Sequence, residues 1–526
     1  MIARWLAGAV GLLVAGVVVG SLPSCSLLLA SRDCEDNSDC SAGAACSADG
    51  LCVAMVTEQC DYAIGEVGDP GSVTLGALMP TVGGNRDSGI YVRQAIELAV
   101  NQINSAGGVG GLQERNLAVL VCNDGGDAEL GKEGARHLVD TVGVPAIIGP
   151  GFSRVLIDVA EEVTIPAGVV LVSHSATAVE IRGLEDDDLV WRTAPPDTFQ
   201  GDTIAYFSTY PLLLAAQSSA SPDVTVALVF AEDAYGRGLA THYRSQLSAY
   251  LLPLSGQLVP SFPEVPYDST DPSSVAEVAT RISELSPDVV ILVGYEEAAD
   301  ILGSVSQIAN LQDVAWFVPD GVRTEALRIA FSQESDKPEF LFGTAPSSRT
   351  DSVVFQAFSD EYLSEYGQGL VAEPQTWTEH AYDATYLLAF ALASVDGEPT
   401  GQQVAAGLSR LSDPEGSAVS VGRDFLVSAT TVMGQGGTLL VHGASGTASF
   451  DPTTGDPQNA DILRWDLRSE GPGNWVYEDC GTASSYSAEQ PLGSPDWCAA
   501  LCASSAGDDD DSAGSDEEPC KPDGVP

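Results

Sequence analysis

Small hydroxyl residues and one carboxylate follow three apolar segments of the chain, each at the point where a predicted strand ends. Ser153 closes the glycine-rich turn 149–153 before a predicted helix, Ser175 and Thr177 follow the next strand, and Asp320 ends a later one. Free N–H groups at a helix start bind carboxylates, and a carboxylate pairs with an ammonium group. Each serine alone is better explained as a helix cap, and Asp320 alone as a solvated turn. Their shared placement at strand ends nevertheless indicates a ligand site.

Other residue patterns do not predict catalysis. The glycines of the segment 126–132 have the spacing of a phosphate-binding loop, but Glu133 stands where that loop needs a Ser or Thr for magnesium. No Gly-x-Ser-x-Gly or His-Glu-x-x-His pattern occurs, and the 5 histidines are scattered. We therefore predict no enzyme activity, no metal site and no cofactor.

Alternating strands and helices are expected to position the candidate residues. Ile90–Asn104 has the apolar periodicity of a helix. Continuous Val, Ile and Leu strands that alternate with helices are typical of parallel sheets covered on both faces. The predicted strands form two series, 73–80, 117–124, 146–150 and 169–175, then 226–230, 289–294 and 316–321. The sequence thus predicts an α/β fold of two doubly wound, Rossmann-like lobes, with ligands at the carboxyl ends of the strands in the cleft between them.

The 526-residue chain is strongly acidic, with 74 Asp and Glu against 22 Lys and Arg. A formal net charge of −52 repels phosphate backbones, so nucleic acid is excluded as a partner. The tail 478–526 contains the run Asp508–Asp511 and is expected to stay solvated. Because the predicted ligand site needs only one acid, Asp320, the acidity is mainly a surface property.

The N-terminus has the features of an export signal. A short basic start, Met1–Arg4, precedes the apolar run Trp5–Gly20. Leu22–Cys25 resembles a bacterial lipobox, so we predict a signal peptide over 1–24 and lipidation of Cys25. The alternative is an uncleaved anchor that continues through Leu27–Ala30. Either interpretation exports the rest of the chain and tethers it to a membrane.

The cysteines indicate an oxidising compartment. Lipidation of Cys25 would leave ten, an even number that suits disulfides. The segment 25–59 holds four at six-residue spacing, Cys34, Cys40, Cys46 and Cys52, and the tail holds Cys480, Cys498, Cys502 and Cys520. For the first four we predict a disulfide staple rather than a zinc site, since no histidine is near, but three pairings remain open.

Nine short blocks follow one another in the order and spacing of a known family. They are GALMP (76–80), INSAGGVGG (103–111), IIGPGFS (147–153), SHSAT (173–177), EDAYGRG (232–238), ILVGYEEA (291–298), VPDG (318–321), HAYDATY (380–386) and HGASG…FDPTTGD (442–456). Together they resemble the type I periplasmic solute-binding proteins, the leucine/isoleucine/valine-binding family, whose fold also forms the ligand-binding region of amino-acid receptors. The resemblance implies two lobes joined by a multi-strand hinge. We divide them as 70–195 with 350–435, and 196–349 with 436–475.

The resemblance also implies a role for each candidate residue. Ser153 and Thr177 would hold the α-carboxylate of an amino acid. The Ser175 carbonyl and the Thr177 hydroxyl would share its ammonium group with Asp320. No residue is given a catalytic role.

Two tyrosines of the second lobe complete the implied site. Tyr235 and Tyr295 would close over the ligand as the lobes move about the hinge. Two positions depart from the family pattern, since Arg154 replaces a small residue and His174 replaces a common proline. Arg154 is expected either to favour an acidic solute or to face solvent.

The family's early disulfide is not reproduced in this chain. Cys122 has no cysteine near Ser153 to pair with, and Cys60 is its expected partner instead. The cysteines then divide into a lipid anchor, a head staple, a body pair and a tail set.

Two functions remain open at this point. The first is a membrane-anchored, exported lipoprotein, periplasmic or at the cell surface, which binds an amino acid or similar small polar solute and delivers it to an ABC permease. The second is a sensory or scaffolding surface lipoprotein that uses the same clamshell for signalling or for recruiting a protein. The cysteine-rich head and the acidic tail favour the second function slightly, because simple shuttling proteins need neither.

Overall fold

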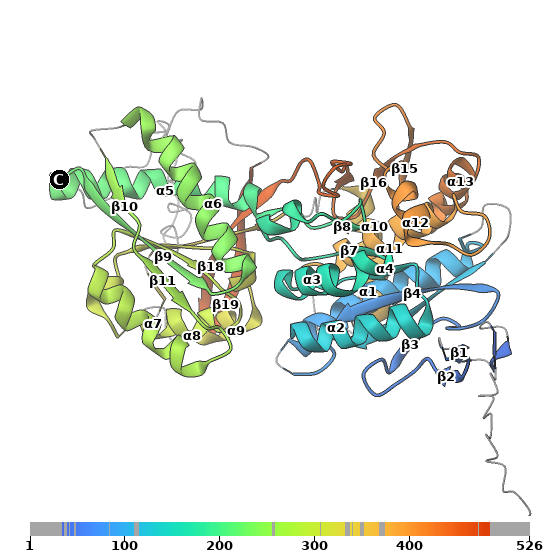
Figure 1. Ribbon diagram of the computed structural model, residues 1–526. Helices are drawn as coiled ribbons and strands as arrows, with labels where there is room; N and C mark the ends of the chain where they lie inside the picture. The colour runs from blue at the N-terminus through green and yellow to red at the C-terminus, as the bar shows by residue number, and fades with distance from the viewer. Residues whose placement is uncertain are drawn as a thin grey trace, which may run out of the picture.

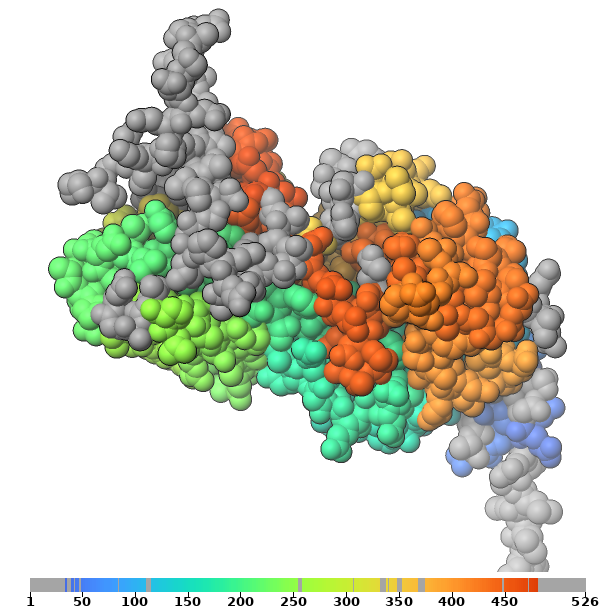
Figure 2. All heavy atoms as spheres, turned by 90° about the horizontal axis from the view of Figure 1, so that it is seen from above, coloured from blue at the N-terminus to red at the C-terminus, as the bar shows by residue number. Residues whose placement is uncertain are grey.

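The chain forms two α/β lobes that lie side by side in a computed structural model (Figure 1). The structure describes residues 34–483, except for 36–38, 42, 47–48, 84, 110–114, 255–257, 306, 332–336, 339, 348–351, 368–373 and 472. Seen from above, the orange and red segments of the C-terminal part contribute to both lobes (Figure 2). The lobes are therefore not consecutive in sequence.

The first lobe is built on a six-stranded sheet that is parallel except for its edge strand β3. In spatial order the strands are β3 (Tyr62–Ile64), β5 (Asn116–Asn123), β4 (Ser72–Met79), β6 (Ala146–Ile148), β7 (Val170–Ser173) and β8 (Val190–Arg192). Alternate side chains of β4 enter two cores, Leu75 and Ala77 on one face and Leu78 on the other. Both faces are thus buried, as continuous apolar strands predict.

Helices cover both faces of this sheet (Figure 1). One face packs against α1 (Arg86–Ser105), α10 (Val353–Tyr366), α11 (Thr378–Leu392), α12 (Gly401–Leu408) and α13 (Arg423–Gly434). The other face packs against α2 (Ala128–Arg136) and α3 (Ser153–Val159). In α1 the predicted stripe of Ile96, Val100 and Ile103 is fully buried, and every residue of α11 is buried.

The second lobe repeats this plan around a longer sheet whose first strands are parallel and whose last two are antiparallel. The strands are β10 (Val259–Ser261), β9 (Asp223–Ala231), β12 (Val289–Val293), β13 (Ala315–Val318), β14 (Phe340–Pro346), β18 (Ile462–Gly471) and β19 (Asn474–Ala483), with β11 (Glu264–Tyr267) also on β9. One core contains α7 (Pro272–Leu285), α8 (Ala298–Val305) and α9 (Glu325–Ala330), and the other contains α5 (Asp197–Ser219) and α6 (Ala234–Leu251). The two predicted doubly wound lobes are confirmed.

The chain crosses between the lobes three times, after β8, after β14 and before β18, which gives the multi-strand hinge. The predicted boundary at residue 436 is wrong. A small sheet of β15 (Ser417–Ser420), β16 (Leu439–His442) and β17 (Thr447–Ala448) precedes the last crossing, and Leu439 and Val441 are buried in the first-lobe core. The predicted start of a solvated tail at 478 is also too early, because β19 pairs with β18 up to Ala483.

The cysteine-rich head is attached to the first lobe. It contains the hairpin of β1 (Ala44–Cys46) and β2 (Cys52–Ala54). Of the three possible disulfide pairings, the structure has Cys34–Cys46 and Cys40–Cys52. The head does not stand apart from the lobe, because Ala45 and Met55 are buried in the core that faces α2 and α3.

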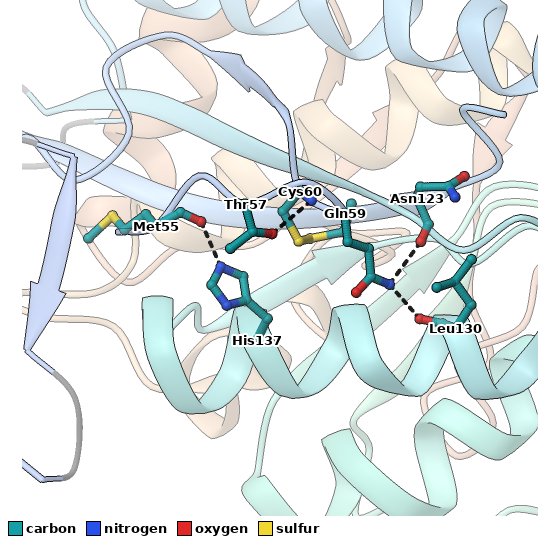
Figure 3. Close-up of a disulfide and its surroundings, with 8 residues drawn as sticks. Met55, Thr57, Gln59, Cys60, Asn123, Leu130 and His137 are labelled. Carbon is teal, nitrogen blue, oxygen red and sulfur yellow. Dashed lines mark hydrogen bonds between the residues drawn. A yellow bond between two sulfur atoms is a disulfide. The ribbon is translucent and has the colours of Figure 1, made fainter. Parts of the chain in front are cut away.

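The expected pair Cys60–Cys122 is present and joins the segment after the head to β5 (Figure 3). Next to it, the Gln59 side chain donates hydrogen bonds to the Asn123 carbonyl at 3.0 Å and to the Leu130 carbonyl at 2.7 Å. His137 Nε2 lies 2.6 Å from the Met55 carbonyl oxygen. These contacts, together with β3, fix the start of the described chain to the first lobe.

Several predictions about the termini concern residues outside the described part of the chain. The signal peptide over 1–24, Cys25 and the tail cysteines Cys498, Cys502 and Cys520 belong to this group. Cys480 is described, and it has no disulfide partner among the described residues. None of the helices that the structure describes is long and apolar enough to cross a membrane.

Candidate functional site

The hydroxyl residues of the first lobe lie on two neighbouring loops at the carboxyl ends of β6 and β7. Ser153 does not cap its own helix, since Phe152 occupies the N-cap position of α3. The Ser153 hydroxyl instead accepts a hydrogen bond of 3.1 Å from the Ala178 N–H. Ser175 Oγ donates to the Gly151 carbonyl at 3.1 Å in the reverse direction. The two loops are therefore held together, which brings Ser153, Ser175 and Thr177 into one cluster.

A buried arginine supports this cluster. Arg192 at the end of β8 donates hydrogen bonds to the carbonyls of Ala176, at 3.2 Å, and Ala178, at 2.9 Å. Its charge is balanced by Asp456, which lies 2.6 Å from Arg192 Nε and 2.9 Å from Arg182 Nε. Because Asp456 lies in the last crossing, the loop that carries Thr177 is tied to the hinge.

The candidate residues of the second lobe form a second cluster. Asp320, directly after β13, accepts hydrogen bonds from Tyr235 Oη at 3.1 Å and from the Gln200 side chain. Tyr235 Oη also accepts a 3.3 Å hydrogen bond from the Gly321 N–H. Asp320 is thus a partly buried, hydrogen-bonded carboxylate at a strand end, and the solvated-turn interpretation is wrong.

Tyr295 links the two clusters. Its hydroxyl donates to Asp233 Oδ2 at 2.6 Å, and its ring lies 5.4 Å from the Tyr235 ring between centroids. On the other side it contacts Phe152 of the first lobe, edge to face, at 5.7 Å between centroids. All six candidate residues therefore lie in or beside the region where the lobes meet.

Sequence reasoning missed two residues at this place, Asp197 and Gln200. They lie in the first turn of α5, directly after the first crossing, and both are buried. Gln200 Nε2 lies 3.4 Å from Asp197 Oδ1 and also bonds Asp320, while the Asp197 N–H donates to the Thr177 carbonyl at 2.8 Å. The signal in the sequence is an Asp and a Gln three residues apart, which places both on one face of a helix.

The two carboxyl groups influence each other. Burial raises the pKa of Asp197 well above its usual value, the negative charge of Asp320 raises it further, and a hydrogen bond from Thr177 opposes the shift. Burial likewise raises the pKa of Asp320. Asp197 Oδ2 is buried without a hydrogen-bond partner in the described part of the chain. Two buried acids this close favour a bound cation or a retained proton.

The two departures from the family pattern do not add charge to the site. Arg154 is exposed, and its positive charge contributes to a lowered pKa of Asp268, whose main causes are hydrogen bonds from Thr270. His174 is buried, and burial, with a smaller contribution from His380, lowers its pKa to about 3, so its ring is uncharged at neutral pH. Of the two expectations for Arg154, exposure to solvent is therefore the one that its position fits.

The discarded motifs have structural roles. Lys132 pairs with Glu129 at 2.8 Å and with Glu162 at 2.7 Å, so its ammonium group is neutralised within the protein. Within the described residues, one group of potential metal ligands lies close together, Cys34, Cys40 and Cys52, and all three belong to disulfides.

Comparison with known proteins identifies the family of this chain. The family described as periplasmic binding protein matches residues 72–433. The chain belongs to this family. It is 28% identical over 393 residues to a chemotactic signal transduction system substrate-binding protein, BasB, of Halobacterium salinarum, with 73% of this chain and 85% of that protein covered.

Two further proteins are similar to this chain, one in part of its sequence and one in fold. A Leu/Ile/Val-binding protein homolog of Brucella melitensis is 26% identical over 244 residues, covering 46% of this chain and 59% of that protein. The chain thus spans less than two thirds of the length of this relative. The crystal structure of LivJ, a branched-chain amino acid transporter substrate binding protein from Streptococcus pneumoniae in complex with isoleucine, superposes with a TM-score of 0.55 at 19% identity, over 79% of this chain and 100% of that chain. The structural match shows the type I periplasmic binding protein fold, and the family match shows that the chain belongs to a family of solute-binding proteins.

Proposed function

We propose that this protein captures an amino acid, or a similar small solute with an ammonium and a carboxylate group, by closure of its two lobes. The observation that carries the proposal is the position of Asp320. It lies at a strand end of the second lobe, hydrogen-bonded by Tyr235 and Gln200, opposite the hydroxyl cluster of the first lobe. One side of the cleft thus offers negative charge to an ammonium group, and the other offers hydroxyl and N–H donors to a carboxylate.

Each candidate residue has one task in this proposal. Ser153 and Thr177 bind the α-carboxylate, and the Ser175 carbonyl joins Thr177 and Asp320 at the ammonium group. Tyr235 and Tyr295 cover the solute from the second lobe. The name of the Leu/Ile/Val-binding relative supports an amino acid as the solute class.

The magnitude of the charge pairing is sufficient for useful affinity. Micromolar binding corresponds to about −8 kcal/mol. Removing one partner of a buried charge pair costs about 3–5 kcal/mol, because the other charge is left uncompensated. Asp320 alone would thus account for a large part of the affinity.

We further propose that the protein is exported and held at a membrane through lipid on Cys25, in the periplasm or at the cell surface. There it would deliver its solute to an ABC permease. The relation to LivJ, which is named as a transporter substrate binding protein, supports this role.

A second candidate function is signalling. The BasB relative is named for chemotactic signal transduction, and the match covers 85% of its length. A sensory lipoprotein would use the same closure to change the surface that it presents to a membrane receptor. A strain that lacks the protein and shows normal solute uptake but no attraction to the solute would select this function.

Native mass spectrometry of the purified full-length protein tests the solute class. We expect a co-purified adduct with the mass of an amino acid, which is released when Asp320 is replaced by alanine. A nucleobase or a sugar as the retained ligand would overturn the amino-acid assignment.

A further inference from the structure

A cavity of about 390 Å³ lies at the hinge, apart from the cleft residues discussed above. Each of the three crossings contributes to its wall, through Thr193 and Pro195, through Pro346 and Ser347, and through the segment 457–461. The remainder comes from α11, from β16 and from the loops next to the small sheet that contains β16. None of the six candidate residues of the cleft lines it.

A histidine and two carboxyl groups supply this cavity with hydrogen-bond acceptors, and its other polar side chains are hydroxyls and one amide, from Thr193, Ser347, Ser445, Ser449 and Asn459. His380 is buried, and its Nδ1 lies 3.0 Å from the Thr193 carbonyl oxygen. A carbonyl can only accept, so Nδ1 carries the proton, and burial lowers the pKa of the ring, which keeps it neutral. Nε2 of His380 therefore carries a lone pair, and it lies 4.0 Å from Glu379 Oε1, whose negative charge opposes the lowering of the His380 pKa.

Two carboxyl groups lie in the wall of the cavity. Burial raises the pKa of Asp383 to about 7, so this group is negatively charged in part of the molecules at neutral pH. Asp383 is only 3% exposed and accepts hydrogen bonds of 2.8 Å from the N–H groups of Ala444 and Ser445. It has no positively charged partner among these contacts, and the second acid, Asp461, lies in the last crossing. Among the described residues that line the cavity there is neither a lysine nor an arginine. The cavity is thus matched to a ligand that donates hydrogen bonds and carries positive charge.

Part of the wall is apolar, with Leu387, Val441 and Phe450 among its residues. A volume of this size accommodates a metabolite rather than a single ion. We propose that this cavity is a second small-molecule site, which binds an organic ammonium compound with an apolar body and is separate from the cleft.

The location of the cavity gives its ligand a regulatory role. The three crossings shift relative to one another when the lobes open or close, since they are the segments about which the lobes turn. A ligand in contact with all three crossings therefore binds more tightly to the protein at one angle between the lobes than at another. By linkage it then changes the affinity of the cleft for its own solute, and the cleft solute changes the affinity of the hinge site by the same factor.

Isothermal titration calorimetry of the full-length protein tests the proposal, with benzylamine as the cationic probe and benzyl alcohol as its uncharged counterpart. We expect one benzylamine per chain, and weaker binding of benzyl alcohol by roughly tenfold or more, because hydrogen bonds to charged groups are the stronger ones. Two variants locate the site. Ala460→Trp fills the cavity from the last crossing, and Asp461→Asn removes one charge without changing the side-chain volume.

We expect Ala460→Trp to abolish benzylamine binding and Asp461→Asn to weaken it severalfold, whereas Asp320→Ala in the cleft leaves it unchanged. Circular dichroism shows whether each variant is folded. If Ala460→Trp does not fold, Asp461→Asn tests the proposal by itself. Absence of benzylamine binding to the wild type at millimolar concentration would overturn the proposal. So would binding that survives both hinge substitutions but is lost in Asp320→Ala, because the amine would then occupy the cleft.

Discussion

Phe152 and Tyr295 come from different lobes and meet edge to face, with 5.7 Å between their ring centroids. Phe152 is the N-cap residue of α3, and Tyr295 follows β12 and is hydrogen-bonded to Asp233. An aromatic pair of this kind contributes about 0.5–1.5 kcal/mol beyond its buried area. The contact therefore stabilises the approach of the lobes at the point where the solute is proposed to bind.

Replacing Phe152 by alanine should favour the open arrangement of the lobes. We expect a larger radius of gyration in small-angle X-ray scattering and an affinity for the solute that falls by roughly 2- to 10-fold, in line with the energy of one aromatic pair. Phe425→Ala is the matched control, since Phe425 is exposed on α13 of the first lobe. An unchanged radius in Phe152→Ala would show that the contact does not hold the lobes together.

Replacing Asp320 by alanine should nearly abolish solute binding. Loss of about 3–5 kcal/mol corresponds to a decrease in affinity of roughly a hundredfold or more. Calorimetry with the solute identified by mass spectrometry measures the effect, and Asp300→Ala, an exposed acid on α8, serves as the control. Normal binding by Asp320→Ala would refute its role at the ammonium group.

The stability of the protein should depend on pH through Asp124. This carboxyl group is fully buried at the end of β5, and burial raises its pKa to about 7. A raised pKa means that the folded state retains a proton that the unfolded chain has already released, so stability falls as the pH rises from about 4 to about 7. Asp124→Asn should remove this loss, at up to about 1.4 kcal/mol per unit of raised pKa.

Thermal unfolding of wild type and Asp124→Asn at pH 4 and at pH 8 measures the difference. The variant should gain melting temperature relative to the wild type at pH 8 and little at pH 4. The comparison between the two proteins removes the effect of the overall negative charge, which both share. Equal pH profiles would mean that Asp124 is already charged at low pH.

Removing the Cys60–Cys122 disulfide should destabilise the first lobe. The two cysteines are 62 residues apart, and loop-closure entropy assigns about 4 kcal/mol to a loop of that length. The double variant Cys60→Ser/Cys122→Ser is compared with Cys40→Ser/Cys52→Ser, which opens a loop of separation 12 within the head. Differential scanning calorimetry should show the larger drop in melting temperature for the first pair. The opposite order would indicate that the head, rather than β5, limits the stability of the lobe.

Much of the fold was predictable because buried parallel strands appear in the sequence as continuous apolar segments. The segments 73–80 and 289–294 consist almost wholly of apolar residues, and the structure places strands at Ser72–Met79 and Val289–Val293. The points where the chain crosses between the lobes have no comparable sequence pattern. Leu439 and Val441 would be apolar in either lobe, and only their burial in the first-lobe core, with β16 beside α13, assigns them to the first lobe.

The candidate site was predictable in part for the same reason. Ser153, Thr177 and Asp320 follow apolar strands, and the ends of parallel strands are where ligands bind. Asp197 and Gln200 follow a crossing instead, and an acid in the first turn of a helix is usually explained by the helix dipole. Their role becomes visible only when α5 is seen beside η7 (Asp320–Val322) of the second lobe.

The attachment of the head to the first lobe has a geometric consequence for the anchored protein. Cys34 comes nine positions after Cys25, and an extended chain reaches at most about 3.5 Å per residue, or roughly 30 Å in all. With lipid on Cys25, the first lobe would be held close to the bilayer. The second lobe has no such attachment among the described residues. It would therefore make nearly all of the movement when the lobes close. A membrane protein that responds to the solute would thus detect the movement of the second lobe relative to a first lobe that stays in place.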